Sequence, residues 1–173
     1  PLHATLKSMH VPRAWRRAAD DILSDRPRRV YVMGEPDAGK STFCAYQMGR
    51  FREEADGACL LDCDPGQSTV GPPATIGLAL PGREELLRFA GSTSPMGYLL
   101  QNVRAIVDLA RRAGTVSHGS GATVVIDSSG FVRSAAGEEF QYTVIDLLRP
   151  EVVVTVGESD AIRRTLASFP EGS

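Results

Sequence analysis

The sequence has little cysteine, no long apolar run and no large net charge. Its three cysteines, Cys44, Cys59 and Cys63, lack the spacing of a metal site, so we interpret them as buried free thiols. We find no signal-peptide pattern and no apolar stretch approaching the roughly 18 residues of a membrane span. We therefore expect a cytoplasmic protein with reduced cysteines and no membrane contact.

The charge balance argues against a strongly basic nucleic-acid-binding protein, because the formal net charge is -2. This leaves room for local basic patches, and arginines do gather in the N-terminal quarter. An apolar content of 42% and a charged content of 23% are ordinary for a globular protein, and 173 residues suffice for one domain with a single core. Composition alone therefore indicates a globular domain and does not indicate a ligand.

Strand and helix patterns alternate along the chain. Short apolar runs predict strands at 29–33, 57–63, 122–126 and 151–156, with weaker patterns at 76–80 and 86–90. Helical spacing of apolar residues predicts helices at 12–24, 39–52, 95–112, 138–148 and 160–169. This alternation predicts a three-layer α/β fold with a mostly parallel sheet.

Residues 34–42 (GEPDAGKST) match the pattern G-x-x-x-x-G-K-[ST] in full and lie between an apolar strand and a helix. Such a P-loop wraps backbone amides around phosphate at a helix N-terminus, which predicts binding of a nucleoside triphosphate with Mg²⁺. We expect Lys40 to reach the β- and γ-phosphates and Ser41 to bind the metal. The predicted nucleotide-binding residues are Gly34, Glu35, Pro36, Asp37, Ala38, Gly39, Lys40, Ser41 and Thr42.

Acidic residues follow two further strands. Asp62 and Asp64 come at the end of the second strand, and Asp127 follows the run at 122–126. Because ligands bind at the carboxyl ends of parallel strands, all three carboxylates should lie at the P-loop edge. If the strand continues through both, Asp62 and Asp64 point to one face, which suits Mg²⁺ binding and deprotonation of an attacking hydroxyl. Asp127 is expected either to hold Mg²⁺ through water or to cap the following loop.

These motifs together resemble the polynucleotide 5′-hydroxyl kinases, which include a subunit of the pre-mRNA cleavage machinery and the ribosomal-RNA processing kinases. The most specific element is the block 62–67 (DCDPGQ) after the second strand, which accompanies a P-loop with aspartate at position 37. Segments 89–95 (FAGSTSP) and 124–132 (VVIDSSGFV) also match. The resemblance covers nearly the whole chain and implies a P-loop NTPase fold that transfers the γ-phosphate of ATP to the 5′-hydroxyl end of RNA or DNA.

The resemblance also implies roles for individual residues. Lys40 and Ser41 would hold the triphosphate and Mg²⁺, Asp64 would be the general base near the metal, and Asp62 would support the metal shell. Gln67 would orient the phosphate or its water shell. Thr93 and Ser94 match a segment that lines the polynucleotide side in relatives. The resulting catalytic set is Lys40, Asp64 and Asp62, the metal set is Ser41, Asp62, Asp64 and Asp127, and the substrate set is Gln67, Thr93 and Ser94.

One departure from the family concerns the lid. Relatives carry an arginine-bearing lid after the helix that follows the fourth parallel strand, and this sequence ends there. We therefore expect a single P-loop kinase domain over residues 1–173, with an N-terminal arm at 1–11 and without that lid.

Other P-loop functions remain open at this stage. Residues 127–130 (DSSG) fit the D-x-x-G of switch ATPases and GTPases, although the chain has no N-K-x-D guanine motif. A nucleotide-binding scaffold without catalysis is a further alternative, which the presence of Lys40, Ser41 and Asp64 argues against. The P-loop alone also allows a small-molecule kinase, because it does not specify the phosphate acceptor.

Overall fold

The computed structural model describes residues 11–54, 57–82 and 85–169, which form six strands and five helices. The expected N-terminal arm falls, apart from Val11, outside the described residues, as does the segment 170–173. The strands join in one sheet in the order β4-β3-β2-β5-β1-β6. Their bounds are β1 (Arg29–Gly34), β2 (Ala58–Asp62), β3 (Thr75–Ala79), β4 (Leu86–Phe89), β5 (Thr123–Asp127) and β6 (Val152–Val156).

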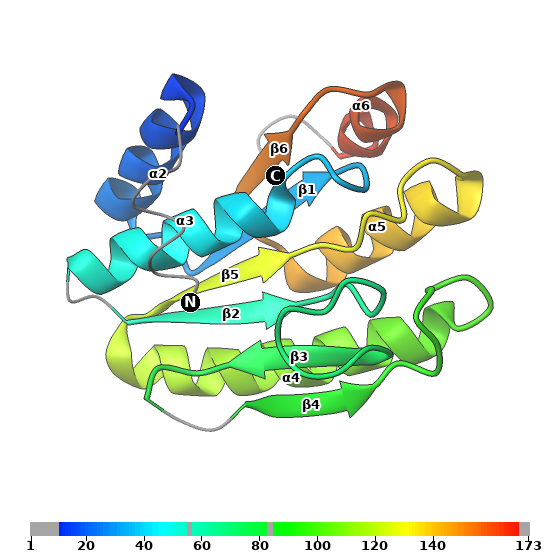
Figure 1. The fold of residues 1–173 in the computed structure, drawn as a ribbon, viewed down its shortest axis with the longest axis horizontal. Helices are drawn as coiled ribbons and strands as arrows, with labels where there is room; N and C mark the ends of the chain where they lie inside the picture. Colours follow the sequence, from blue (N-terminus) through cyan, green and yellow to red (C-terminus); the bar gives the residue numbers. More distant parts are fainter. Residues whose placement is uncertain (1–10, 55–56, 83–84, 170–173) are drawn as a thin grey trace.

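Helices cover both faces of the sheet (Figure 1). One face carries α2 (Arg13–Asp25) and α3 (Lys40–Glu53), and the other carries α4 (Leu99–Ser120), α5 (Ala135–Leu148) and α6 (Asp160–Ala167). Strands β2, β5, β1 and β6 are parallel, while β3 pairs antiparallel with both β2 and β4. The three-layer α/β fold with a mostly parallel sheet, expected from the sequence, is therefore confirmed.

The buried strand β5 shows how the sequence produces this layering. All five of its residues are buried, and successive side chains point to opposite faces of the sheet. Val124 and Ile126 pack into the core beneath α4 and α5, whereas Val125 packs into the core beneath α3. Each such aliphatic side chain contributes about 1.5–3 kcal/mol when fully buried, so a strand that is apolar on both faces is held firmly at the centre.

The structure also corrects helix bounds: the helix expected at 138–148 begins at Ala135, and the largest change concerns α4. The pattern indicated a helix at 95–112, but α4 begins at Leu99 and ends at Ser120. Gly97 adopts a left-handed conformation with φ of 81°, which interrupts helical backbone before Leu99. At the other end the helix continues past Arg112 because Ala113 is fully buried in the core, and it stops where Gly121 forms a left-handed cap.

None of the helices in the described part of the chain combines the length and the apolar character that a membrane crossing requires.

Candidate active site

Three loops meet at the carboxyl ends of the central parallel strands, at the edge where the arrowheads of β1, β2 and β5 lie in Figure 1. They are the P-loop (residues 34–42), the loop 62–70 after β2, which we call the acidic loop, and the loop 127–134 after β5, which we call the β5 loop. Because β5 lies between β1 and β2, the P-loop and the acidic loop flank the β5 loop. The sheet order therefore brings together motifs that are far apart in the sequence.

The P-loop backbone requires glycine at its two ends. A Cβ on Gly34 would lie 2.6 Å from the carbonyl oxygen of Val156 in β6, so only glycine allows β1 and β6 to approach this closely. Gly39 has φ of 98° and forms the N-cap of α3, where its carbonyl accepts the first helical hydrogen bond from Phe43. The free amides at the start of α3 form an anion-binding helix N-terminus.

Lys40 is folded back over this loop. Its side chain is 6% exposed, and Nζ donates a hydrogen bond to the carbonyl oxygen of Glu35 at 3.0 Å. Trp15 of α2 packs against the outer side of the same loop, because a Cβ on Gly39 would lie 3.4 Å from the indole ring. Trp15 also meets Phe43 edge-on, with ring centroids 5.5 Å apart. As the single tryptophan of the chain, Trp15 is a spectroscopic reporter placed directly on the P-loop.

Asp127 lies at the end of β5 in register with Asp62 of β2, and both carboxylates are almost fully buried. Burial raises the pKa of Asp127 to about 7, and the negative charges of Asp62 and Asp64 raise it as well. The Ser41 hydroxyl and the Lys40 ammonium act in the opposite direction and lower this pKa. One oxygen, Oδ1, is buried without a hydrogen-bond partner among the described residues. An uncompensated buried oxygen of this kind fits a cation or its bound water.

Asp62 is engaged by its own loop. Oδ1 accepts a hydrogen bond from the backbone amide of Asp64, and Oδ2 accepts from the hydroxyls and amides of Ser68, Thr69 and Val70. Five hydrogen bonds therefore end on this carboxylate, which holds the acidic loop in its turn. The direct metal role predicted for Asp62 competes with all of these bonds.

Asp64 lies beyond the end of β2, so the strand does not continue through both aspartates as the sequence allowed. Its Oδ1 accepts hydrogen bonds from the amides of Gly66 and Gln67 at 2.9 and 3.2 Å, and its Oδ2 accepts one from Gly130 of the β5 loop at 3.2 Å. These amides fix the carboxylate between two loops. Because a carboxylate has about four acceptor positions, Oδ2 keeps one free for a substrate proton.

Further contacts tie the P-loop to its neighbours. The Gln67 side-chain amide donates to Asp37 Oδ1 at 3.3 Å and so bridges the acidic loop to the P-loop. Gly130 packs against Pro36, where a Cβ would lie 3.0 Å from the Pro36 backbone. Sequence reasoning missed Arg133, whose guanidinium pairs with Glu35 of the P-loop at 2.8 Å. No motif marks this arginine, because its role depends on the β5 loop folding back over the P-loop.

Thr93 and Ser94 lie in the segment between β4 and α4, next to the acidic loop. The Thr93 carbonyl oxygen is 2.7 Å from the position that a Cβ on Gly66 would occupy, so the two loops touch. The Ser94 hydroxyl accepts a hydrogen bond from the amide of Met96 at 3.2 Å and shapes the turn. Both side chains are exposed at the site edge, which is compatible with their predicted substrate role.

The described residues contain no group of three or more His, Cys, Asp or Glu side chains that would hold a metal ion. Among the predicted metal residues, Asp62 and Asp64 accept hydrogen bonds from loop amides and hydroxyls. A magnesium ion in a P-loop protein takes most of its ligands from phosphate and water, with one hydroxyl and one carboxylate nearby. Ser41 and Asp127 are a hydroxyl and a carboxylate of this kind, and their side chains are hydrogen-bonded to each other.

Residues 34–170 match the family model of the mRNA cleavage and polyadenylation factor CLP1 P-loop. Curated relatives include a polyribonucleotide 5′-hydroxyl-kinase of Thermococcus kodakarensis, which is 28% identical over 174 residues, covering 92% of this chain and 47% of the relative. A second, from Methanocaldococcus jannaschii, is 22% identical over 158 residues, covering 84% of this chain and 42% of the relative. The chain thus spans less than half the length of these relatives.

Solved structures support the same fold. Structures of Clp1p with Pcf11p superpose with TM-scores of 0.75 and 0.72 at 12% and 13% sequence identity. Each match covers 92% of this chain and 46% or 45% of the solved chain. At this identity the likeness concerns the fold of the chain.

Proposed function

Since the chain belongs to the family of mRNA cleavage and polyadenylation factor CLP1 P-loop domains, we propose that it is an ATP-dependent polynucleotide 5′-hydroxyl kinase. The acceptor in this proposal is the 5′-hydroxyl end of RNA or DNA, and the donor is ATP with Mg²⁺. The relatives from Thermococcus kodakarensis and Methanocaldococcus jannaschii carry the name of this activity.

One observation carries the proposal. The Asp64 carboxylate is fixed by amides of two different loops, at the same sheet edge as a complete P-loop. A P-loop NTPase needs a residue that positions the attacking water, whereas a kinase needs a carboxylate that accepts the proton of an incoming hydroxyl. The immobilised Asp64 meets the second requirement.

The nucleotide phosphates bind to the amides of residues 34–42 and to the Lys40 ammonium. Lys40 exchanges its hydrogen bond with the Glu35 carbonyl for a phosphate oxygen, so its charge is already held at the loop before the nucleotide enters. Phosphoryl transfer depends mainly on positioning and on neutralising charge in the transition state, and Lys40 and the α3 N-terminus supply part of both.

The metal site of the proposal consists of Ser41 and Asp127. The donor set fits Mg²⁺, because both are oxygen ligands and Asp127 Oδ1 is buried without a partner among the described residues. Bound Mg²⁺ would neutralise charge on the β- and γ-phosphates. Asp127 must lose its proton to serve this role, and the neighbouring Lys40 and Ser41 already favour the ionised form.

In the transfer step the 5′-oxygen of the polynucleotide forms a bond to the γ-phosphorus while the bond from that phosphorus to the β,γ-bridging oxygen breaks. ADP leaves, and the hydroxyl proton passes to Oδ2 of Asp64. Asp62 acts through Asp64, because its five hydrogen bonds hold the acidic loop in place. Gln67 aligns the acidic loop with the P-loop, and Thr93 and Ser94 contact the polynucleotide end.

The test is transfer of labelled γ-phosphate from ATP to oligonucleotides that end in a 5′-hydroxyl. Lys40→Ala and Asp64→Asn should each remove transfer, while the exposed control Asp146→Asn on α5 should keep it. Asp64→Asn should still bind ATP, as judged from Trp15 fluorescence, because it leaves the P-loop intact.

Absence of transfer by the unmodified protein to any RNA or DNA oligonucleotide would overturn the proposal. ATP or GTP hydrolysis stimulated by a protein partner would then favour a switch ATPase or GTPase. Nucleotide binding without turnover would favour a scaffold that lacks catalysis. Comparison with nucleosides as acceptors tests the small-molecule alternative in the same assay.

A further inference from the structure

We propose that a surface beside the site binds the single-stranded polynucleotide downstream of its 5′ end. This surface, the β4 edge surface, consists of Phe89, Met96, Tyr98, Leu100, Gln101 and Arg104. The proposal rests on the kinase function above and extends it: the enzyme would select polynucleotide ends over short acceptors by contacts several nucleotides from the reacting hydroxyl.

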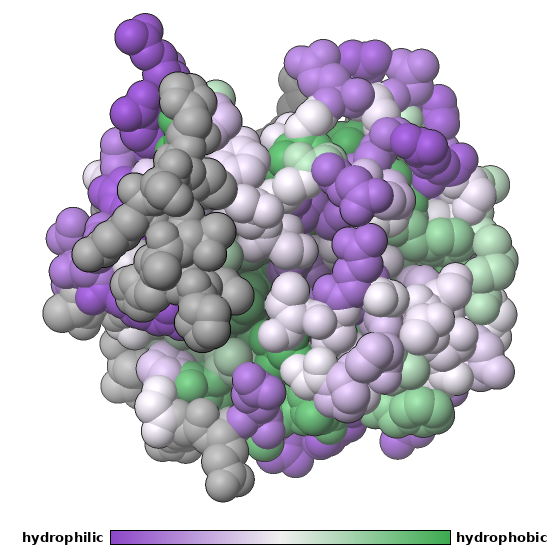
Figure 2. All heavy atoms as spheres, in the orientation of Figure 1, coloured by the Kyte–Doolittle hydropathy of each residue, from purple (hydrophilic) through white to green (hydrophobic). Residues whose placement is uncertain are grey.

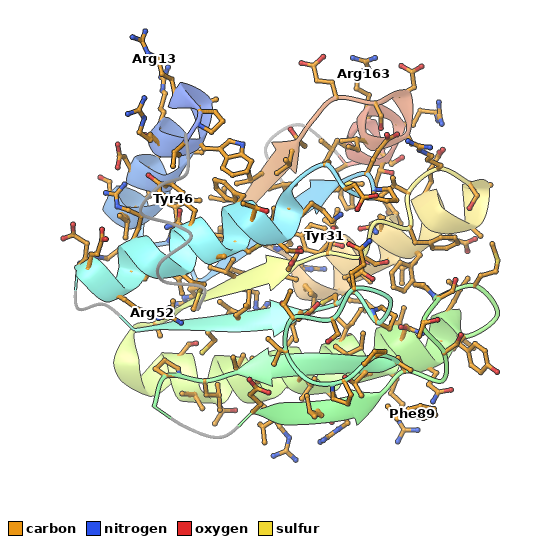
Figure 3. All side chains as sticks on the ribbon, viewed as in Figure 1. Arg13, Tyr31, Tyr46, Arg52, Phe89 and Arg163 are labelled. Atoms are coloured by element: carbon orange, nitrogen blue, oxygen red, sulfur yellow. The ribbon has the colours of Figure 1, made fainter. Side chains whose placement is uncertain are left out.

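The first observation is an unusual exposure of apolar side chains. Phe89 is 66% exposed and Leu100 is 87% exposed, and Met96 and Tyr98 are also largely in contact with solvent. Figure 3 places Phe89 at the outer end of β4, and Figure 2 shows hydrophobic surface in that region of the same view. Exposed apolar side chains that gather in one place mark a binding surface more often than singly scattered ones.

The surface is hollowed and carries positive charge. Two open depressions of about 510 and 410 Å³ adjoin there and share Gln101. Arg88 is paired with Asp108 at 2.6 Å, and Arg104 interacts with the same carboxylate electrostatically. With Arg111, three arginines therefore share one acidic residue in the larger depression. An excess of positive charge beside exposed aromatic rings is the combination that binds a single strand, since bases stack on the rings and phosphates approach the cations.

A continuous series of contacts joins this surface to the acidic loop. Gly66 of the acidic loop touches Thr93, and further along the same segment the Tyr98 ring lies across Gly91, where a Cβ would come within 2.4 Å of it. Gln101 also borders Gly91, and its side-chain amide donates to the Phe89 carbonyl at 3.4 Å. A strand whose 5′ end lies at Asp64 therefore has an unbroken path to Phe89.

The segment that carries this path is held firmly. The buried Asn102 side-chain amide donates hydrogen bonds to the carbonyls of Ala90 and Tyr98, at 3.1 and 2.9 Å. These bonds join the end of β4 to the start of α4 and fix the backbone that carries Tyr98. A fixed ring loses little conformational entropy when a base stacks on it.

A protein partner is the other class of occupant that exposed Leu100 and Met96 would suit. The polynucleotide is favoured because the surface is continuous with the site that receives a 5′ end and because Arg104 and Arg111 provide complementary charge. A protein partner would not require either feature.

The experiment measures binding and transfer with 5′-hydroxyl oligonucleotides of two, five and ten nucleotides. The unmodified protein should bind and phosphorylate the decamer with a lower Kd and KM than the dinucleotide. Phe89→Ala should raise both constants for the decamer by about fivefold or more, the value of one lost base stack, and leave the dinucleotide unchanged. Arg104→Ala should lower the salt dependence of decamer binding by about 0.7 in the logarithmic slope.

Matched controls are available on the same protein. Leu147→Ala removes another exposed apolar side chain, on α5, and Arg52→Ala removes an exposed arginine at the far end of α3, labelled in Figure 3. Neither should change decamer binding.

Equal Kd values for dinucleotide and decamer, or a decamer affinity that Phe89→Ala and Arg104→Ala leave unchanged, would overturn the inference and point to a protein partner. Those results would leave the kinase proposal standing if transfer to the dinucleotide persists. Length-dependent binding that needs Phe89, without any transfer, would support the surface and contradict the kinase.

Discussion

The two ends of the parallel strands differ in the polar and charged groups that lie there. At the P-loop edge Lys40 and Arg133 both contact Glu35, beside glycines, backbone amides and buried carboxylates. The opposite edge carries a hollow of about 300 Å³ whose lining includes four arginines, Arg26, Arg28, Arg29 and Arg149. This arginine-rich edge therefore gathers cations without the motif that binds phosphate.

Helix direction explains the difference. The N-terminus of α3 lies at the P-loop, whereas α2, α4 and α5 end at the opposite edge with left-handed caps at Arg26, Gly121 and Arg149. Carbonyl groups at helix C-termini attract cations, and Arg29 donates a hydrogen bond to the carbonyl of Leu148, the last residue of α5. At the arginine-rich edge, cations therefore lie next to the carbonyl groups of helix C-termini. At the P-loop edge, the backbone amides of a helix N-terminus are placed to bind phosphate.

The largest effect is expected from a comparison of two carboxylates, one at each edge, that accept hydrogen bonds from backbone amides. Asp62 is buried and holds the acidic loop, whereas Glu151 is exposed and accepts from the amides of Arg28 and Arg29. Asp62→Ala should lower the free energy of unfolding by about 3 kcal/mol or more, because several buried hydrogen-bond donors lose their acceptor. Glu151→Ala should cost about 1 kcal/mol or less. Urea denaturation measures both, and equal losses would contradict the contrast.

A second prediction concerns pH and Asp127. Because burial raises its pKa from 3.8 to about 7, the folded protein keeps a proton that the unfolded chain releases above about pH 4. The free energy of unfolding should fall as pH rises through this window, by at most about 1.4 kcal/mol per pH unit, and level off above about pH 7. Asp127→Asn should flatten the profile between pH 5 and 7 in denaturation experiments. A profile unchanged by this substitution would show that other groups cause it.

The third prediction tests the arginine-rich edge. Arg29→Ala removes the hydrogen bond to the Leu148 carbonyl and should destabilise the fold by about 1 kcal/mol. ATP affinity, followed through Trp15 fluorescence, should stay unchanged, because the opposite edge takes no part in nucleotide binding. Weakened ATP binding in this variant would mean that the arginine-rich edge communicates with the P-loop.

The smallest effect is expected for Arg133→Ala. The ion pair between Arg133 and Glu35 is exposed, and it lowers the pKa of Glu35 through the hydrogen bond and charge of the guanidinium. ATP affinity should fall slightly at low salt and match the unmodified protein at high salt, since exposed pairs are screened. A deficit that persists in high salt would instead indicate direct contact between Arg133 and a phosphate.

The sequence predicted the fold well because its strongest signals are local. The apolar run of β5 and the glycines of the P-loop require those conformations almost independently of the rest of the chain. The start of α4 was wrong by four residues, because the left-handed turn at Gly97 competes with a helical pattern that begins at Pro95. When a local sequence allows two backbone conformations, the sequence pattern alone does not show which of them the tertiary contacts stabilise.

The candidate site was less accessible from the sequence. The prediction placed Asp62, Asp64 and Asp127 at one edge, which the sheet order bears out, but the pattern did not separate their environments. Asp62 is occupied by five hydrogen bonds, Asp64 by three amides, and Asp127 keeps an unpartnered oxygen. These differences arise from loop backbone geometry. The ion pair between Arg133 and Glu35 also depends on that geometry, which is why the sequence did not indicate it.

The close approach of Gly34 to the Val156 carbonyl has a consequence for synthesis of the chain. Gly34 leaves the ribosome before Val156, because β6 is the last strand to emerge among those described. A nascent chain that stops before β6 contains the complete P-loop sequence without the neighbour that shapes it. Nucleotide capture during translation should therefore begin only after Val156 has emerged.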